Sequence, residues 1–249
     1  MLNLIALGCI LFTACGSVEA EDYLNNRMNK TENKMIIKQF NNPDFFSCNV
    51  YVLSSEKGNI LVDPGFYSED IRQYIKSIGG LDAILLTHGH WDHTKGLDEL
   101  KADYPSVSIY LNKLDKEFLR DPHLNGSDDK GFSLVLNTDP ILIEEGNHSI
   151  GGYEIEVIHM PGHTIGSSMY YLKEENILFT GDFLHAEMPT TTFRPTGSDA
   201  AQQNSMRRFK SLIFPDDMQV CFGHGKAITY RKMIEIHPCF DRGLKDTSN

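Results

Sequence analysis

Four side chains of metal-binding type follow one apolar strand within a stretch of six residues. The stretch HGHWDH, which begins at His88, comes directly after the predicted strand 83–87. Alternate residues of an extended segment point to the same side, so His88 and His90 can bind one ion, and the turn after them brings Asp92 and His93 towards a second. Imidazole nitrogen and carboxylate oxygen suit divalent metals such as zinc. The stretch therefore predicts a metal site at the end of a strand.

Three more polar residues follow predicted strands further along the chain, and each has a glycine beside it. They are His163 in PGHT, Asp182 in TGD and His224 in GHG. Glycine lets the backbone turn sharply where a strand ends, so each loop can direct one side chain into a shared cleft. Together with HGHWDH, these residues predict two groups of three ligands and one bridging carboxylate.

The pattern from Met35 onward indicates an α/β fold, because short β-rich runs alternate with helical patterns. The predicted helices, each given with the residue that opens it and the residue that stops it, are Ser68 to Gly79, Asn112 to Pro122 and Ser198 to Pro215. The predicted strands are 35–40, 49–53, 59–62, 83–87, 108–111, 155–159, 169–172, 177–180 and 219–222.

Two hairpin patterns in the chain are similar to each other. The segment YVLSSEKGNILVD ends at Asp63, and the segment YYLKEENILFTGD ends at Asp182. Unrelated hairpins also share similarities this short, so coincidence stays open. If the two segments are a repeat, the chain forms two related sheets packed together, with helices outside, as one four-layered domain.

The HxHxDH stretch with a later His, Asp and His resembles the metallo-β-lactamase superfamily, and the resemblance runs from Met35 to about Cys239. Asp63 in VDPG resembles the superfamily's first acidic motif, whose side chain orients the ligands. The contexts FTGD at Asp182 and FGHG at His224 are most similar to the glyoxalase II-like hydrolase branch. The resemblance implies a four-layer αββα sandwich, in which two packed mixed β-sheets carry helices on the outside.

The resemblance also implies a ligand set and a reaction. Two divalent ions lower the pKa of the water between them towards about 7. The resulting hydroxide would attack a carbonyl carbon, for which a thioester is well suited because its thiolate leaves without help from an acid. Zinc is the first expectation, and iron and manganese accept the same ligands. The implied ligands are His88, His90 and His163 on the first ion, Asp92, His93 and His224 on the second, and Asp182 between them, with Asp92 also catalytic as the group that orients the nucleophile or relays its proton.

Two regions depart from glyoxalase II. Few residues follow His224 in this sequence, so the helical domain that binds glutathione is not expected in full, and another thioester, ester or lactone stays open as substrate. Residues 183–197 lack the glycine-arginine-aspartate pattern that is common in the branch. Arg194 and Lys226 are the nearest basic candidates for a substrate carboxylate, with ordinary surface charges as the alternative, and His185 is expected in the wall of the site.

Other activities stay open on the same residues. A persulfide dioxygenase of the same branch would use one iron held by His88, His163 and Asp182. A binding module would keep the metal ligands without turnover. β-Lactamase activity is not expected, because antibiotic-hydrolysing relatives usually lack either His93 or Asp182.

The composition favours a folded protein that acts on a small molecule. The chain has 34 acidic and 23 basic residues, for a net charge of -11, and no basic run, so a nucleic-acid substrate is not expected. Its 249 residues are 41% hydrophobic, which is ordinary for a globular protein. The five cysteines include no CxxC pair and predict no disulfide framework. No pattern indicates an oligomeric state.

The N-terminal extension, residues 1–34, has two open interpretations. An apolar run followed by TACGS resembles a bacterial lipoprotein signal peptide with a lipid anchor at Cys15, although no Lys or Arg precedes this cysteine. Alternatively, the start is misassigned and the protein begins near Met35. The first interpretation predicts a cell-envelope lipoprotein, the second a cytoplasmic protein, and neither includes a stable membrane span. The predicted divisions after the extension are a metallo-β-lactamase-like domain at 35–240 and a C-terminal tail at 241–249.

Overall fold

The computed structural model describes residues 35–41 and 48–240. The N-terminal extension, the lipid anchor at Cys15 and the tail 241–249 lie outside the described residues, so the interpretations that depend on them stay predictions. Within the described ranges, no helix combines the length and the apolar character needed to cross a membrane.

The first sheet contains six strands, and their order in space is their order in the chain. Its first three strands pair antiparallel, and the third to sixth pair parallel. The strands are β1 (Ile36–Phe40), β2 (Val50–Ser55), β3 (Gly58–Val62), β4 (Ala83–Leu86), β5 (Ser108–Asn112) and β6 (Ile141–Ile143). All four residues of β4 are buried, as expected for a central parallel strand that is covered on both faces.

The second sheet also contains six strands, in the order β12-β11-β10-β9-β8-β7. The pairing of β10 with β11 is parallel and the others are antiparallel. The strands are β7 (Gly146–Ile150), β8 (Tyr153–His159), β9 (Ser168–Leu172), β10 (Ile177–Gly181), β11 (Gln219–Phe222) and β12 (Ile228–Thr229). The hairpin β9–β10 with its parallel neighbour β11 therefore matches the hairpin β2–β3 with β4, and Asp63 and Asp182 follow the corresponding strands β3 and β10.

The main hydrophobic core lies between the two sheets. Alternate side chains of the facing strands meet there, including Leu53 of β2, which is fully buried. The rings of Tyr51 and Phe179 pack edge to face across the interface, with centroids 5.4 Å apart. The hydroxyl of Tyr170 donates a hydrogen bond to the Leu86 carbonyl oxygen at 2.7 Å, which joins β9 to the end of β4 just before the HGHWDH stretch.

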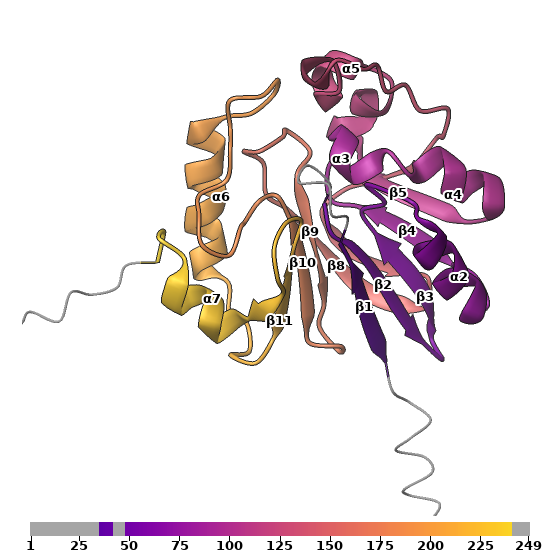
Figure 1. Cartoon of the computed structure of the whole chain (residues 1–249). Helices are drawn as coiled ribbons and strands as arrows, with labels where there is room; N and C mark the ends of the chain where they lie inside the picture. The colour runs from indigo at the N-terminus through magenta and orange to yellow at the C-terminus, as the bar shows by residue number, and fades with distance from the viewer. Residues whose placement is uncertain (1–34, 42–47, 241–249) are drawn as a thin grey trace, which may run out of the picture. The chain divides into compact units, whose positions relative to one another are not determined.

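Helices cover the outer face of each sheet (Figure 1). On the first sheet, Ile71 and Ile75 of α2 pack with Leu97 of α4 in one apolar cluster, and on the second sheet Phe209 of α6 packs with Met233 of α7 in another. The predicted four-layer αββα sandwich is therefore confirmed. The helices are α2 (Glu69–Ser77), α3 (Trp91–Thr94), α4 (Leu97–Asp103), η1 (Lys113–Leu119), α5 (Pro122–Asn125), η2 (Asp128–Lys130), α6 (Asp199–Ser211) and α7 (Tyr230–Ile236).

Several elements differ from the sequence predictions. The segment from Asn112 is not an α-helix but the 3₁₀ helix η1, in which residues three apart lie on the same side. This geometry places Asp115 and Phe118 together against Gly89. The sequence also gave no signal for β6, which has only three residues, or for β7, which is mostly polar; both are edge strands that pair on one side only.

We expect Leu53→Ala to lower the free energy of unfolding by about 2–5 kcal/mol, because it removes a fully buried side chain between the sheets. The matched control is Ile213→Ala, since Ile213 is 95% exposed, and its effect should stay within about 0.5 kcal/mol. Urea unfolding followed by circular dichroism measures both. Equal effects of the two substitutions would contradict the placement of Leu53.

Candidate metal centre

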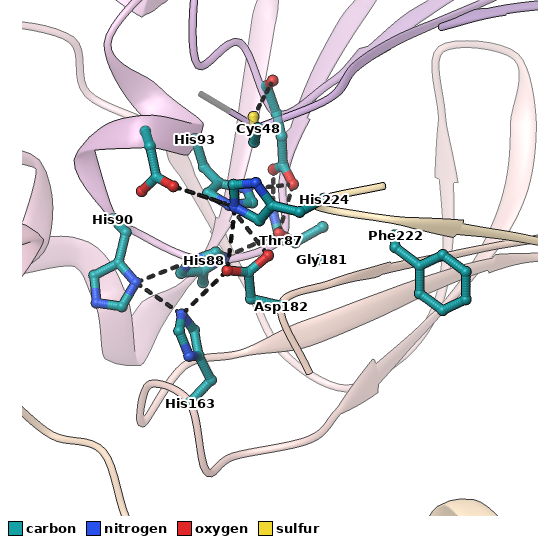
Figure 2. A network of polar contacts seen from close by, with 12 residues as sticks. Cys48, Thr87, His88, His90, His93, His163, Gly181, Asp182, Phe222 and His224 are labelled. Atoms are coloured by element: carbon teal, nitrogen blue, oxygen red, sulfur yellow. Dashed lines mark hydrogen bonds and ion pairs between the residues drawn. The ribbon is translucent and has the colours of Figure 1, made fainter. Parts of the chain in front are cut away.

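The seven predicted ligands lie in loops at one end of the paired sheets. The HGHWDH stretch follows β4, and its second half forms the short helix α3, which begins at Trp91. His163, Asp182 and His224 follow β8, β10 and β11, respectively. Figure 2 shows the side chains of His88, His90, His93, His163, Asp182 and His224 pointing towards one another from these separate loops.

Three imidazole nitrogens converge in the first group. His90 Nδ1 lies 3.0 Å from His88 Nε2 and 2.9 Å from His163 Nε2. Burial lowers the pKa of all three histidines, that of His90 to about 3. Neutral imidazoles carry the lone pairs that a divalent ion requires, so this group is suited to metal binding.

The second group consists of Asp92, His93 and His224, with Asp182 between the two groups. The Asp182 carboxylate lies 3.3 Å from His93 Nε2, 3.5 Å from His224 Nε2 and 3.6 Å from His163 Nε2. The Asp92 carboxylate lies 3.3 Å from His224 Nε2. Asp182 thus contacts histidines of both groups, which is the position that a bridging carboxylate needs.

The acidic and basic side chains of the second group and Asp182 stabilise one another's charged forms. Burial opposes a charge on His224, but Asp182 and Asp92 outweigh it and raise its pKa to about 9. Burial likewise opposes the charge of Asp182, and the neighbouring histidines His93 and His224 lower its pKa nonetheless. The carboxylates therefore stay ionised, as metal ligands must be.

The donor set fits divalent metal ions. The ligand atoms fall into three overlapping groups, within each of which they lie no more than 4.8 Å apart. His93 Nε2 and Asp182 Oδ1 are buried and lie 3.3 Å apart, but neither atom makes a hydrogen bond. Buried polar atoms seldom lack a hydrogen bond, and a cation in contact with both atoms would compensate for it. The groups are His88 with His90 and His163, His88 with His93 and Asp182, and Asp92 with His93 and His224.

Asp63 lies on the side of His93 that faces away from the centre and orients the ligands there, as expected from the sequence. Its carboxylate accepts hydrogen bonds from the Thr87 backbone N–H at 2.7 Å and the Thr87 hydroxyl at 2.6 Å. It also accepts one from His93 Nδ1 at 2.9 Å, which leaves His93 Nε2 to face the centre. The Thr87 oxygen lies 3.1 Å from His88 Nδ1, so the same network fixes His88.

Glycine at position 223 is required by the closeness of the ligands. A Cβ atom there would lie 2.1 Å from Asp182 Oδ1 and 2.7 Å from His93 Cε1. No larger residue fits without moving a ligand. In the sequence this glycine is recognisable only as a turn former, and in the structure it also leaves room for the ligands.

Two hollows open beside the ligands and share Asp182, Thr191 and His224 in their linings. The metal pocket, of about 190 Å³, also contains Lys130 and Arg194. The wide cleft, of about 780 Å³, is lined by His185 and Lys226 together with apolar side chains.

The predicted basic residues have different surroundings. Arg194 lies in the metal pocket, but its guanidinium forms an ion pair with Asp129. Lys226 is exposed in the wide cleft, with no ion pair among residues 35–41 and 48–240. His185 belongs to none of the three ligand groups, and its ring lies 6.0 Å from that of His224, as expected for a wall residue.

The structure also brings to the site residues that the sequence analysis missed. Thr191 accepts a hydrogen bond from His163 Nδ1 through its carbonyl oxygen at 2.8 Å, which directs Nε2 towards the centre. Asp115 contacts the loops of both His90 and His163. Neither contact has a signal in the sequence, because both depend on loops that are distant along the chain.

Comparisons with known proteins agree with this site. The sequence model of the metallo-beta-lactamase superfamily matches residues 43–224. A probable metallo-hydrolase, YqgX of Bacillus subtilis, is 35% identical over 180 residues, which cover 71% of this chain and 84% of the relative. The hydroxyacylglutathione hydrolase GloC of Haemophilus influenzae is 30% identical over 191 residues, which cover 75% of this chain and 89% of the relative.

Solved structures show the same fold. The BLEG-1 B3 metallo-beta-lactamase has a TM-score of 0.74 and 32% identity, and the match covers 82% of this chain and 99% of that one. TTHA1623 in a di-iron-bound form has a TM-score of 0.70 and 26% identity, and the match covers 82% of this chain and 98% of that one. The ligand geometry, the αββα fold and these matches agree: the chain belongs to the metallo-β-lactamase superfamily.

Proposed function

We propose that this protein is a metal-dependent hydrolase that cleaves a carbonyl substrate, with a thioester as the first choice and another ester or a lactone as the alternatives. The main support for the proposal is that both ligand groups converge on Asp182, which lines an open cleft. The names of YqgX and GloC, a probable metallo-hydrolase and a thioester hydrolase, support the same class of reaction.

The ligand groups would hold two divalent ions, His88, His90 and His163 on one side and Asp92, His93 and His224 on the other. When bound, such ions polarise a carbonyl oxygen and lower the pKa of a water molecule towards about 7. Zinc is our first choice, and iron is supported by the di-iron form of TTHA1623.

Asp92 is the carboxylate best placed to act on the reacting water. Its side chain is 18% exposed, whereas that of Asp182 is 9% exposed and that of His93 is fully buried. It lines the metal pocket and is held from the side by His224 Nε2. It can therefore orient a water molecule and carry its proton towards the leaving group.

The two hollows suit the two parts of an acyl substrate. The metal pocket is small and polar, and its size fits a short acyl group. The wide cleft has apolar walls formed by Ala186, Met188, Ile228 and Ile236, and its lining also includes Glu187 and, as its cation, Lys226. An extended thiol or alcohol portion fits this cleft, and an anionic group on it would reach Lys226.

The rival enzyme class is a mononuclear iron persulfide dioxygenase that uses His88, His163 and Asp182. That reaction gives no metal-binding role to Asp92, His93 and His224, although they form a compact group of their own. We therefore favour hydrolysis, and oxygen consumption distinguishes the two reactions.

The deciding experiment combines elemental analysis of protein purified without added metal with a substrate panel. We expect about two metal ions per chain and hydrolysis of a thioester, lost with a chelator and restored by Zn²⁺ or Mn²⁺. The panel also includes a lactone, a phosphodiester and a β-lactam, the last because of the likeness to BLEG-1. One iron per chain with oxygen uptake would indicate the dioxygenase, and no turnover by fully metallated protein would indicate a binding module.

We expect Asp92→Asn to lower kcat by roughly 10²- to 10⁴-fold at saturating metal, because the amide cannot accept the proton of the water. Metal content measured alongside separates this loss from weaker binding at the second ligand group. The control is Asp70→Asn, in the first turn of α2 and exposed, which should leave kcat unchanged. Full activity of the Asp92 variant would refute the proposed role.

We expect Lys226→Gln to raise KM by roughly two- to fivefold for a thioester whose thiol portion carries a carboxylate, with kcat unchanged, because an exposed ion pair contributes up to about 1 kcal/mol. A matched thioester with a neutral amide in place of the carboxylate should show no change. Lys232→Gln, on α7, is the control substitution. Equal changes for both substrates would show that Lys226 does not recognise the anion.

A further inference from the structure

A buried carboxylate joins two of the loops that carry the predicted metal ligands. Asp115, on η1, is fully buried. Its Oδ2 accepts hydrogen bonds from the Gly89 N–H at 3.0 Å and the Thr164 hydroxyl at 2.7 Å, and its Oδ1 accepts one from the Gly166 N–H at 2.7 Å. Gly89 lies between His88 and His90, and Thr164 follows His163. One side chain therefore ties both sides of the first ligand group together.

The packing around Asp115 leaves little freedom to either loop. A Cβ atom on Gly166 would lie 2.5 Å from Asp115 Oδ1, and one on Gly89 would lie 2.4 Å from Phe118 Cβ. Asp115 and Phe118 are three residues apart in a 3₁₀ helix, so both face the HGHWDH loop. The Phe118 ring also packs against the His90 ring, with centroids 5.8 Å apart. η1 therefore contacts two consecutive residues of the HGHWDH loop, Gly89 and His90.

The three donors to Asp115 carry no charge of their own. Burial raises the pKa of Asp115 to about 6, although the hydrogen bonds from Thr164, Gly89 and Gly166 act in the opposite direction. Keeping this carboxylate ionised inside the protein therefore costs stability at neutral pH. An apolar residue would avoid that cost but could not bind donors of two loops at once. The role of Asp115 is therefore to hold the two loops in position and not to stabilise the fold.

We propose that Asp115 is a positioning residue for the first ligand group: it fixes the distance between the His88–His90 loop and the His163 loop. The contact of His90 Nδ1 with His163 Nε2 at 2.9 Å spans these two loops and depends on their separation. Asp63 orients the second group through His93, and in the first group it reaches only His88, through Thr87. Loss of Asp115 should therefore lower the affinity of the first ligand group for its ion and leave the affinity of the second group unchanged. This inference rests on the proposed metal centre but not on the proposed substrate.

The test is Asp115→Asn, which keeps the shape of the side chain but turns an amide N–H₂ towards a donor. Metal-free protein is titrated with Co²⁺ in competition with a chelator, and the visible absorption of bound Co²⁺ is recorded. We expect one of the bound ions to lose affinity by roughly ten- to a hundredfold, as is usual for residues that support metal ligands. We also expect the Co²⁺ absorption of that ion to change, which a loss of stability alone would not produce.

Two further variants control for folding. Thr164→Val removes one donor and leaves the carboxylate intact, so it should lower the affinity for the same Co²⁺ ion by a smaller factor. This variant keeps the test available if Asp115→Asn does not fold. Asp98→Asn is the matched control, since Asp98 accepts hydrogen bonds from the Thr138 hydroxyl at 2.8 Å and the Asn137 N–H at 3.1 Å and contacts no ligand. It should lower the melting temperature of the metal-free protein without changing Co²⁺ affinity.

The outcomes separate this inference from the proposed function. Unchanged Co²⁺ affinity and absorption in folded Asp115→Asn, or in Thr164→Val where the first variant does not fold, would overturn the positioning role. Equal weakening by Asp98→Asn would overturn it as well. A parent protein that binds Co²⁺ but hydrolyses no substrate would refute the hydrolase proposal, whereas the predicted loss of affinity in the variants would still support the role of Asp115.

Discussion

Three neutral imidazole nitrogens that converge inside this protein are suited to bind a cation, and the surrounding loops hold them in that arrangement. The nitrogens of His88, His90 and His163 lie about a hydrogen-bond length apart, yet burial keeps the rings neutral. Two rings are fixed through their other nitrogen, since His163 donates to the Thr191 carbonyl oxygen and His88 Nδ1 lies against the Thr87 hydroxyl, and the His90 ring packs against Phe118. The supporting network defines the site before any ion binds.

The two-sheet architecture explains how distant residues reach one place. β4, β8, β10 and β11 end at the same edge of the sandwich, and the segments after them carry the ligands. The corresponding hairpins end in Asp63 and Asp182, but the two carboxylates have different tasks. Asp63 binds Thr87 and the back of His93, whereas Asp182 faces histidines of both ligand groups. A similar structural element thus supplies an orienting carboxylate in one sheet and, in the other, a carboxylate that lies between the two ligand groups.

The sequence predicted the parts of this site that depend on spacing. HGHWDH, and the later His163, Asp182 and His224, were recognisable because each lies just after an apolar run and, for the last three, beside glycine. Asp115 was not recognisable, because its partners are 26 and 49 residues away and because a 3₁₀ rather than an α-helical segment aims it. Edge strands β6 and β7 were not recognisable for local reasons, because β6 has only three residues and β7 is mostly polar. Arg194 was recognised as a charge, but its pairing with Asp129 depends on tertiary contacts.

One kind of metal centre can be combined with walls of different chemistry. The hydroxyacylglutathione hydrolase GloC and the BLEG-1 B3 metallo-beta-lactamase are 30% and 32% identical to this chain, respectively. A metal centre that polarises a carbonyl group and activates water does not distinguish a thioester from a lactam by itself. Specificity must come from the walls, where 183–197 and the loop after His224 contribute Met188 and Lys226 to the wide cleft. Thr191, in 183–197, holds His163 through its backbone carbonyl oxygen, which every residue type supplies. The side chains of these walls can therefore change while the groups that position the ligands stay in place.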